Sequence, residues 1–561
     1  MGFCRAMVMG KFMAGMASVC CVAALCSARA AVYHISPDGD DLQSGLSPES
    51  AWQTVGRVNA AMFAPGDQIL FEGGKIFPGP VKFDKADGGS PENPVLVSSY
   101  NLELGRAIIL GGEGRGIDVY NTTGLHITDL KVVGDGAKEN LLSGISLLST
   151  TEGGASHVEI ERVEVSGFGR HGISIGAWKT VAGYRNVRIS NCSTHNNWRT
   201  GVFTWGPWGA GIYAHRKIYI GDTEAYKMKG GSGLTFSSVD GGIIERCIVH
   251  NNGEEYSGGA GIWAWDSNDI LFQYNESYEN RTTGVDGDGF DFDGGVTNSI
   301  MQYNYSHDND AAGYLLAQYK YAPQAMNNII IRYNISENDC RKKAYGAIHV
   351  WNGDEGDRIQ NIHIYQNTVY LTPQPKTQRS LISRKLRAVM QAVGLVQAPF
   401  EPSAIAVISP TTSVSVYNNI FYTTKGGRLV KVVEGQDRIL FKNNAYWADN
   451  GPFNVRWMGE EYKTLAAWLK GAKDQERNGA RILAINENPK LIAPGTGGTL
   501  GRAELLTTLE GYKLQSDSPL VGRGLDILQT FGVDPGSKGF FGKAIPTDLP
   551  PAIGAHLLQG S

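Results

Sequence analysis

Short apolar strands followed by a polar turn recur through the middle of the chain. Aligning the copies on the residue after each strand gives one column: Val163, Cys192, Thr223, Cys247, Asn275, Asn304, Asn334, Asn367, Asn419 and Asn444. Most copies are separated by 24 to 33 residues, and one spacing of 52 separates Asn367 from Asn419. Strand alternation without a helical period at this repeat length predicts an all-β fold. We expect a right-handed parallel β-helix, a solenoid of roughly ten or more coils.

The column itself predicts an inward Asn ladder. Equivalent residues of adjacent coils stack about 4.8 Å apart, so inward Asn side chains can bond one another and the turn backbone. Cys192 and Cys247 stand two coils apart, which excludes a disulfide between them and predicts two buried thiols. Asn275, Asn304 and Asn334 also begin glycosylation sequons, which we interpret as accidental because ladder positions face inward.

A second strand in each coil begins with glycine. The clearest copies are residues 172–175, 201–205, 233–237, 261–265, 289–293, 313–317 and 346–350. Side chains alternate faces along a strand, so the apolar set that includes Phe290 and Phe292 is expected in the core. The opposite set then faces outward, and it includes Asp291 and Asp293. The same count from its glycine assigns His349 to the inward set.

A cluster of acidic residues follows the strand at 261–265, whose outward positions are the tryptophans Trp263 and Trp265. It comprises Asp286, Asp288, Asp291 and Asp293, with Asp310 one coil later. Asp291 and Asp293 share a strand face roughly 6.6 Å apart, and crowding of like charges raises at least one pKa. A protonated acid beside a carboxylate is what glycoside hydrolysis requires. We predict Asp291 and Asp293 as catalytic residues, with Asp288 and Asp310 as partner or positioning groups.

The neighbouring residues suggest sugar binding. Outward tryptophans beside carboxylates can stack on sugar rings, and a long loop burying them is the competing interpretation. The predicted binding residues are Trp205, Trp263, Trp265, Asp266, Arg281 and Lys343. No cofactor is required by this interpretation. The alternative for the acids is a calcium site made by Asp286, Asp288, Asp291 and Asp293, because hard cations bind clustered carboxylates.

The N-terminal segment, the net charge and the cysteine count restrict the class of protein. Residues 1–30 combine Arg5, Lys11 and Arg29 with a short apolar run and an Ala-x-Ala end, which predicts a signal peptide and a secreted or periplasmic protein. No later stretch is apolar and long enough to cross a membrane. The net charge of −4, more negative without the leader, argues against nucleic acid as a partner. Three cysteines outside the leader exclude a disulfide scaffold.

The ends of the chain carry a family resemblance. Residues 33–41, 45–48, 51–55 and 65–71 resemble the opening of secreted right-handed parallel β-helix proteins of the pectate-lyase-like superfamily, and residues 516–522 and 553–555 resemble their closing segment. The resemblance covers nearly all of the chain after the leader. It implies a carbohydrate-active enzyme, and because this fold hosts lyases, hydrolases and epimerases it does not choose among them.

These observations predict one β-helix with appended segments. We expect the β-helix, with its N-terminal cap and an insertion at 372–412, to span 31–450, and a C-terminal segment, 451–561, with a helix near 462–472, to pack on it. The predicted function is an exported, monomeric glycoside hydrolase acting on a poly- or oligosaccharide. A calcium-dependent polysaccharide lyase using Lys343 or Lys320, and a non-catalytic glycan-binding solenoid, are the alternatives.

Overall fold

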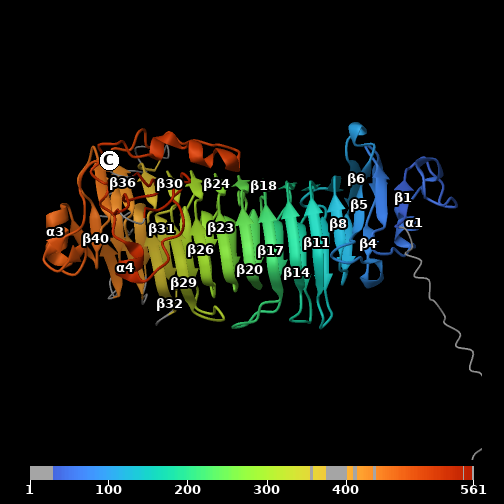
Figure 1. Cartoon of the computed structure of the whole chain (residues 1–561), viewed down its shortest axis with the longest axis horizontal. Helices are drawn as coiled ribbons and strands as arrows, with labels where there is room; N and C mark the ends of the chain where they lie inside the picture. The colour runs from blue at the N-terminus through green and yellow to red at the C-terminus, as the bar shows by residue number, and fades with distance from the viewer. Residues whose placement is uncertain are drawn as a thin grey trace, which may run out of the picture.

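The computed structural model describes residues 30–353, 358–374, 401–408, 413–433, 438–546 and 549–558. Over these residues the chain winds into an elongated parallel β-helix, with α1 (Val55–Asn59) at its N-terminal end and α3 (Leu465–Gly471) at the other (Figure 1). The leader predicted for 1–30 lies outside the described residues apart from Ala30. Residues 375–400 and 409–412 of the expected insertion also lie outside them.

Three long sheets form the sides of the β-helix, and each coil contributes one strand to each sheet. The first sheet contains β1 (Val32–Ile35), β2 (Gln68–Glu72), β5 (Val95–Tyr100), β8 (Leu125–Thr128), β11 (Ala155–Glu161), β14 (Tyr184–Ser190), β17 (His215–Gly221), β20 (Val239–Glu245), β23 (Asn268–Gln273), β26 (Thr297–Gln302), β29 (Met326–Arg332), β32 (Ile359–Tyr365), β35 (Val414–Tyr417) and β38 (Ile439–Lys442).

The second sheet, called the site sheet below, contains β4 (Val81–Phe83), β7 (Ile117–Tyr120), β10 (Ile145–Ser149), β13 (His171–Ala177), β16 (Thr200–Trp205), β19 (Leu234–Ser237), β22 (Gly259–Trp265), β25 (Asp286–Phe292), β28 (Tyr314–Gln318), β31 (Gly346–Asn352), β34 (Ser403–Ile408), β37 (Arg428–Val432), β40 (Val455–Trp457) and β41 (Glu460–Tyr462). All neighbouring strands in it run parallel except the final pair, β40 and β41.

The third sheet contains β3 (Ile76–Pro78), β6 (Ala107–Gly112), β9 (Leu130–Gly134), β12 (Glu164–Ser166), β15 (Ser193–His195), β18 (Glu224–Tyr226), β21 (Ile248–His250), β24 (Glu276–Tyr278), β27 (Tyr305–His307), β30 (Ile335–Glu337), β33 (Thr368–Leu371), β36 (Ile420–Thr424) and β39 (Ala445–Asp449). The remaining elements are short: α4 (Ile527–Phe531), β42 (Arg477–Asn478), β43 (Arg481–Ile482), η1 (Pro48–Ser50), η2 (Lys85–Asp87), η3 (Leu102–Leu104), η4 (Ala503–Thr508) and η5 (Glu510–Tyr512).

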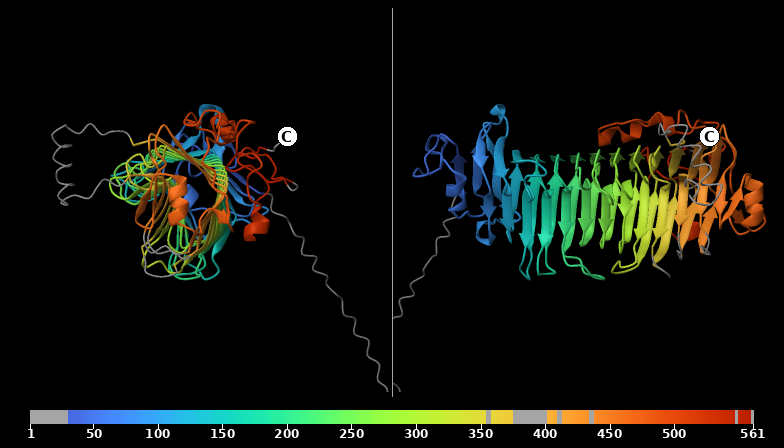
Figure 2. Two further views of the ribbon diagram at one scale, coloured as in Figure 1. Left: turned by 90° about the vertical axis from the view of Figure 1, so that its left-hand side faces the viewer. Right: turned by 180° about the vertical axis from the view of Figure 1, so that it is seen from behind.

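The interior is a continuous apolar column. Inward residues of the site sheet, including Ile262, Phe290, Phe292 and Leu316, are fully buried in it, as the strand alternation predicts. Trp468 of α3 packs against the last coil, and Figure 2 shows that helix across the end of the column. Because the helix covers apolar side chains that another coil would otherwise cover, it closes the core at that end.

The predicted Asn ladder is confirmed. The amide Nδ2 of Asn275 donates to Oδ1 of Asn304 at 3.0 Å, and the same bond continues through Asn334, Asn367 and Asn419 to Asn444. Each of these Oδ1 atoms also accepts a backbone N–H from the preceding coil. The series ends where Asn444 donates to Glu476 at 2.7 Å. Every ladder amide therefore has a partner without water.

A second ladder was not predicted from the sequence. Asn252 donates to Asn280, Asn280 to Asn309, and Asn309 to Asp339, with distances of 3.0, 2.9 and 2.8 Å. Cys192 and Cys247 are buried free thiols, as expected. The two ladders fix neighbouring coils in register on both sides of the third-sheet strands, which keeps the site sheet regular over many coils.

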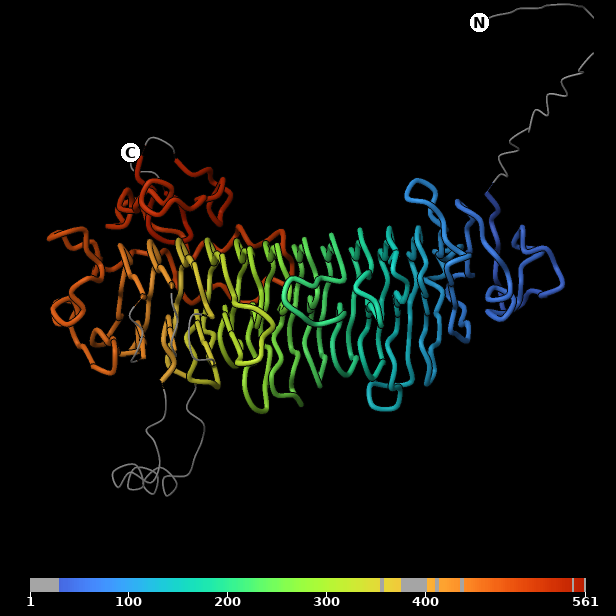
Figure 3. Tube along the Cα trace, turned by 90° about the horizontal axis from the view of Figure 1, so that it is seen from below, coloured from blue at the N-terminus to red at the C-terminus, as the bar shows by residue number. Residues whose placement is uncertain are grey.

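The C-terminal residues run back along the third sheet (Figures 1 and 3). The backbone N–H groups of Leu500 and Gly501 both donate to the buried carboxylate of Glu276 at 2.7 Å, and Tyr512 donates to Glu337 at 2.6 Å. The expected helix near 462–472 is α3. Within the described residues, no helix is long and apolar enough to span a bilayer.

Candidate active site

The outer face of the site sheet carries a column of residues in register. Pairing between successive strands aligns Trp263 with Asp291, Asp291 with Leu315, and Leu315 with His349. The same alignment continues from His349 through Ala406 to Lys431 and Arg456. Successive members stand about 4.8 Å apart, so one face of the β-helix presents acidic, apolar and basic residues in sequence.

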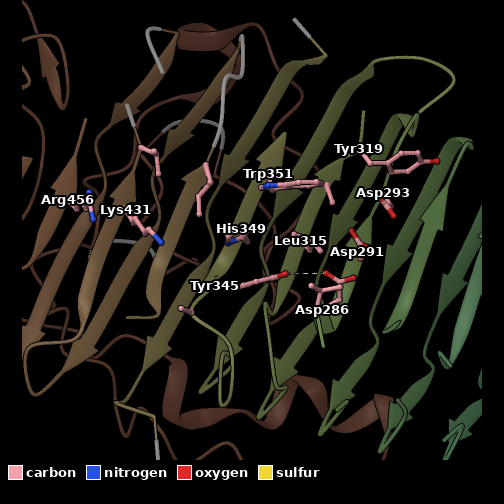
Figure 4. Close-up of a pocket in the computed structure, with 15 residues that line it drawn as sticks. Asp286, Asp291, Asp293, Leu315, Tyr319, Tyr345, His349, Trp351, Lys431 and Arg456 are labelled. Atoms are coloured by element: carbon pink, nitrogen blue, oxygen red, sulfur yellow. Dashed lines mark hydrogen bonds between the residues drawn. The ribbon is translucent and has the colours of Figure 1, made fainter. Parts of the chain in front are cut away.

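A cavity of about 620 Å³ opens on this face, and we call it the acid pocket. Asp286, Asp291 and Asp293 lie at one end of it, and Lys431 and Arg456 lie at the other (Figure 4). Its wall is otherwise mainly apolar or aromatic. The other lining residues are Val285, Leu315, Ala317, Tyr319, Ala344, Tyr345, His349, Trp351, Ile408 and Val433.

Asp286 reaches the pocket because β25 begins irregularly. In a regular strand this residue would share the inward face with Asp288 and Phe290. Asp286 and Gly287 instead adopt positive φ angles of 58° and 94°, and the pairing with β22 shifts register at Gly259. The Tyr345 hydroxyl donates to Oδ1 of Asp286 at 3.4 Å. A local backbone distortion therefore adds a third carboxyl group to the two on the outward face.

Two predicted catalytic residues lie outside the acid pocket. Asp288 is 0% exposed, lies on the inward face of β25, and accepts the backbone N–H of Ala312 at 2.6 Å. Asp310 accepts the N–H of Thr282 at 3.0 Å and pairs with Arg281 at 3.4 Å. Both carboxyl groups hold the backbone at the entrance of neighbouring coils, so a contact with substrate has no geometric support for either.

The four residues of the alternative calcium site do not all lie on the same side of β25. Asp286, Asp291 and Asp293 line the acid pocket, whereas Asp288 faces the other side of the strand. In the part of the chain that the structure describes, no group of three or more His, Cys, Asp and Glu residues is arranged to hold a metal ion. The four carboxylates proposed as a set therefore do not converge on one point.

The predicted binding residues are distributed over several places. Trp263 and Trp265 are half-buried beside the pocket and do not line it, and Trp265 packs edge-on against Trp208. Trp205 lines a separate cavity. Asp266 is buried beneath the loop that carries Trp208, and it accepts the N–H of Gly209 at 3.4 Å. The interpretation that a loop buries the tryptophans therefore holds in part, because the loop that carries Trp208 packs against Trp265.

Neither of the predicted basic residues, Arg281 and Lys343, lines the acid pocket. Arg281 is engaged by Asp310 and Glu279. Lys343 does not line the acid pocket, although its charge lowers the pKa of Asp286. The basic side chains that do line the pocket, Lys431 and Arg456, come from coils beyond the expected insertion and were not identified from the sequence.

His349 was assigned to the wrong face. Counting from Gly346 made it an inward residue, but the strand pairing places Ile348 inward and His349 outward. The backbone N–H of Gly313 donates to the Ala347 carbonyl, so Ala347 occupies the place that glycine holds in the preceding coils. His349 stacks on Tyr345, with ring centroids 4.6 Å apart, and its Nδ1 accepts the N–H of Gly346.

Burial controls the electrostatics of the acid pocket. Burial raises the pKa of Asp293 to about 7, and the charge of Asp286 adds to the shift. Burial, together with Asp293, Asp288 and Asp286, raises the pKa of Asp291 well above its usual range. The pKa of Asp286 is also raised by burial, although the Tyr345 hydroxyl and Lys343 oppose the shift. Burial lowers the pKa of His349 to about 3, so its ring is neutral.

The raised pKa of Asp291 predicts a pH-dependent stability. The folded protein retains a proton on this group that the unfolded chain loses above about pH 4, so this group's stabilising contribution declines as the pH rises from there towards the folded pKa. Asp291→Asn is therefore expected to raise the melting temperature at pH 8 and to change it little at pH 4. Differential scanning calorimetry at both pH values measures this, and an equal shift at both would contradict it.

Comparisons with known proteins agree with this architecture. Residues 205–369 match a family model described as a right handed beta helix region. A lacto-N-biosidase from Bifidobacterium longum subsp. longum is 24% identical over 448 residues, which cover 60% of this chain and 27% of that protein. The chain thus aligns with about a quarter of that relative's length.

A solved structure shows the same fold. The selenomethionine derivative of a GH136 lacto-N-biosidase from Eubacterium ramulus superposes with a TM-score of 0.52 and 17% identity, covering 76% of this chain and 68% of that one. An alginate lyase from Paenibacillus sp. str. FPU-7 gives a TM-score of 0.40 and 17% identity over 55% of this chain and 97% of that one, a likeness too weak to bear on chemistry. The chain therefore folds as a right-handed parallel β-helix.

Proposed function

We propose that the protein is a glycoside hydrolase whose acid pocket cleaves a glycosidic bond with Asp286, Asp291 and Asp293. The observation that carries the proposal is that these three desolvated carboxyl groups line the same end of a largely apolar cavity. Like charges this close cannot all ionise at little cost, so the cluster holds at least one proton near neutral pH. Glycoside hydrolysis uses one protonated and one ionised carboxyl group.

The surroundings favour a division of roles within the cluster. The hydroxyl of Tyr345 and the charge of Lys343 stabilise the anion of Asp286, so this group ionises first. The proton is then held by the pair Asp291 and Asp293, whose pKa values burial raises. We assign the donated proton to Asp293, because its pKa of about 7 lies near neutral pH. This proton passes to the glycosidic oxygen, while the carboxylate of Asp286 attacks the anomeric carbon or activates water.

The rest of the pocket suits a sugar ring. Trp351 is 37% exposed at the mouth and offers an aromatic face, and Leu315 lies on the wall beside the acids. Aromatic faces bind the apolar side of pyranose rings, and the apolar wall strengthens electrostatic interactions by excluding water. The named relatives, both lacto-N-biosidases, make a lacto-N-bioside one probe for this chain among others.

The test is a screen of the purified protein on neutral and acidic glycans that includes p-nitrophenyl lacto-N-bioside. Reducing ends and absorbance near 235 nm are read together, with EDTA and calcium arms. New reducing ends without an absorbance rise, unchanged by EDTA, would support hydrolysis. An absorbance rise that EDTA abolishes would indicate the calcium-dependent lyase instead. Export remains a prediction from residues 1–30 alone.

The proposed acid also predicts the basic limb of the pH profile. Because Asp293 has a pKa of about 7, it loses its proton as the pH rises through that value. We expect kcat to fall about tenfold per pH unit above roughly pH 8 if the protonated form is required. Initial rates from pH 4 to 10 at saturating substrate measure this, and a rate that is constant from pH 6 to 10 would contradict the role.

A further inference from the structure

A second cavity lies on the same outer face, in coils closer to the N-terminus. It has a volume of about 380 Å³ and we call it the N-terminal pocket. The lining residues include Arg115, Arg170, His171, Trp178, Phe203 and Trp205. The strand register places Phe203 three coils before Asp291, through Thr235 and Trp263. Three coil spacings correspond to about 14 Å.

The aromatic side of this pocket is fixed in place. Trp205 lies across Gly176, where any side chain larger than hydrogen would collide with its ring, and its Nε1 donates to the Ser174 hydroxyl at 3.0 Å. Trp178 is 55% exposed and meets Trp205 edge-on, with ring centroids 6.4 Å apart. A large exposed tryptophan beside an immobilised one is a surface suited to stacking on a sugar ring.

One polar group in the pocket lacks a partner. His171 is 6% exposed and stacks on Phe203 at 4.6 Å, yet its Nδ1 is buried without a hydrogen bond among the described residues. Burial and the charges of Arg170 and Arg199 lower its pKa to about 3, so the ring is neutral. Because this nitrogen has no exposed surface, His171 contributes a neutral aromatic wall to the pocket rather than a hydrogen-bonding point for a ligand.

The charge of the N-terminal pocket is opposite to that at the acidic end of the first one. Arg115 and Arg170 both line it, and the nearest carboxylate to Arg115 is Asp118, at 3.6 Å. Among the residues that the structure describes, no carboxylate forms an ion pair with Arg170. An unpaired guanidinium is well suited to a planar carboxylate or a sulfate, because it offers several donors in a fixed geometry.

We propose that the N-terminal pocket is a second glycan-binding site, which takes a sugar residue bearing an anionic group, a carboxylate or a sulfate ester. The sugar ring stacks against the tryptophans Trp178 and Trp205, and the anionic group binds Arg170. This site binds whether or not the acid pocket performs hydrolysis, so its failure in a binding assay would leave the proposed function intact.

The test measures binding of three small probes to the full chain by saturation-transfer NMR titration. The probes are methyl β-glucuronide, methyl β-glucoside and glucose 6-sulfate. We expect a Kd at least about fivefold lower for the glucuronide or the sulfate than for the neutral glucoside. A preference shared by both anions would identify a general anion site, and a preference for the glucuronide alone would identify a carboxylate site.

Two arginine variants separate the cavities. Arg170→Gln changes an exposed residue and should remove the preference for the anionic probe, whereas the matched Arg456→Gln in the acid pocket should leave it unchanged. Trp178→Ala, which removes the exposed stacking surface, should weaken the binding of all three probes. Equal affinity for charged and neutral probes, no binding of any probe, or a preference lost in Arg456→Gln and retained in Arg170→Gln would overturn the proposal.

Discussion

Asp293→Asn is expected to lower kcat on the identified glycoside by roughly 10²–10⁴-fold, with KM changed little. The amide has nearly the same shape as the acid but cannot supply a proton. Asp293 accepts the N–H of Gly294 at 2.7 Å, and an amide oxygen can keep that bond. The substitution therefore removes the proton donor and leaves the local backbone intact. Steady-state kinetics with the variant at its pH optimum measure the effect.

The matched control is Asp269→Asn. Asp269 is exposed on the first sheet, away from the acid pocket, and its positive φ of 54° suits asparagine as well as aspartate. This variant should retain the kinetics of the parent protein. If Asp293→Asn kept more than a tenth of the parent kcat while folding normally, the acid pocket would not be the catalytic site and the proposed function would need another centre.

The fold was predictable because its constraints repeat. Each coil must satisfy the same buried backbone groups at the same corner, so the ladder from Asn275 to Asn444 recurs at the spacing of the coils and is visible in the sequence. The glycine that starts each site-sheet strand recurs for a similar reason. Side-chain atoms of Ser277 and Ser306 lie where a Cβ at Gly261 or Gly289 would stand.

The site was only partly predictable because residues on the outer face do not have to recur from coil to coil. Asp291 and Asp293 were found from strand alternation, which holds through the end of β25. Asp286 was not identified as catalytic because its direction depends on a backbone irregularity that no periodic count contains. His349 was placed inward because Ala347, one residue after Gly346, takes the glycine position in that coil.

The basic residues of the acid pocket could not be placed from the sequence for a different reason. Lys431 and Arg456 belong to strands more than 130 residues after Asp291, yet the sheet register places them on the same face. The spacing of 52 between Asn367 and Asn419 interrupts the count of coils in the sequence at this point. The strand pairing across that interruption is visible only in the three-dimensional structure. It is this pairing that brings the acidic and basic ends of the acid pocket together.

Asn334→Ala is the second large expected effect, and it concerns stability. Oδ1 of Asn334 accepts both the backbone N–H and the side-chain amide of Asn304, and its own Nδ2 donates to the carbonyl of Met301. The truncation leaves these fully buried groups unpaired, at about 1–3 kcal/mol for each one that finds no water. We expect a loss of roughly 3 kcal/mol in the free energy of unfolding, measured by urea denaturation.

The control for this loss is Asn327→Ala, seven residues earlier in the same coil. Asn327 is half-buried on the outer side of β29, where water can replace any contact that its amide makes. This change should alter stability by less than about 0.5 kcal/mol. Because coils of a solenoid contact only their neighbours, the ladder defect should also lower the cooperativity of unfolding around β26 to β32. Equal losses from the two variants would mean that the loss in Asn334→Ala does not come from breaking the ladder.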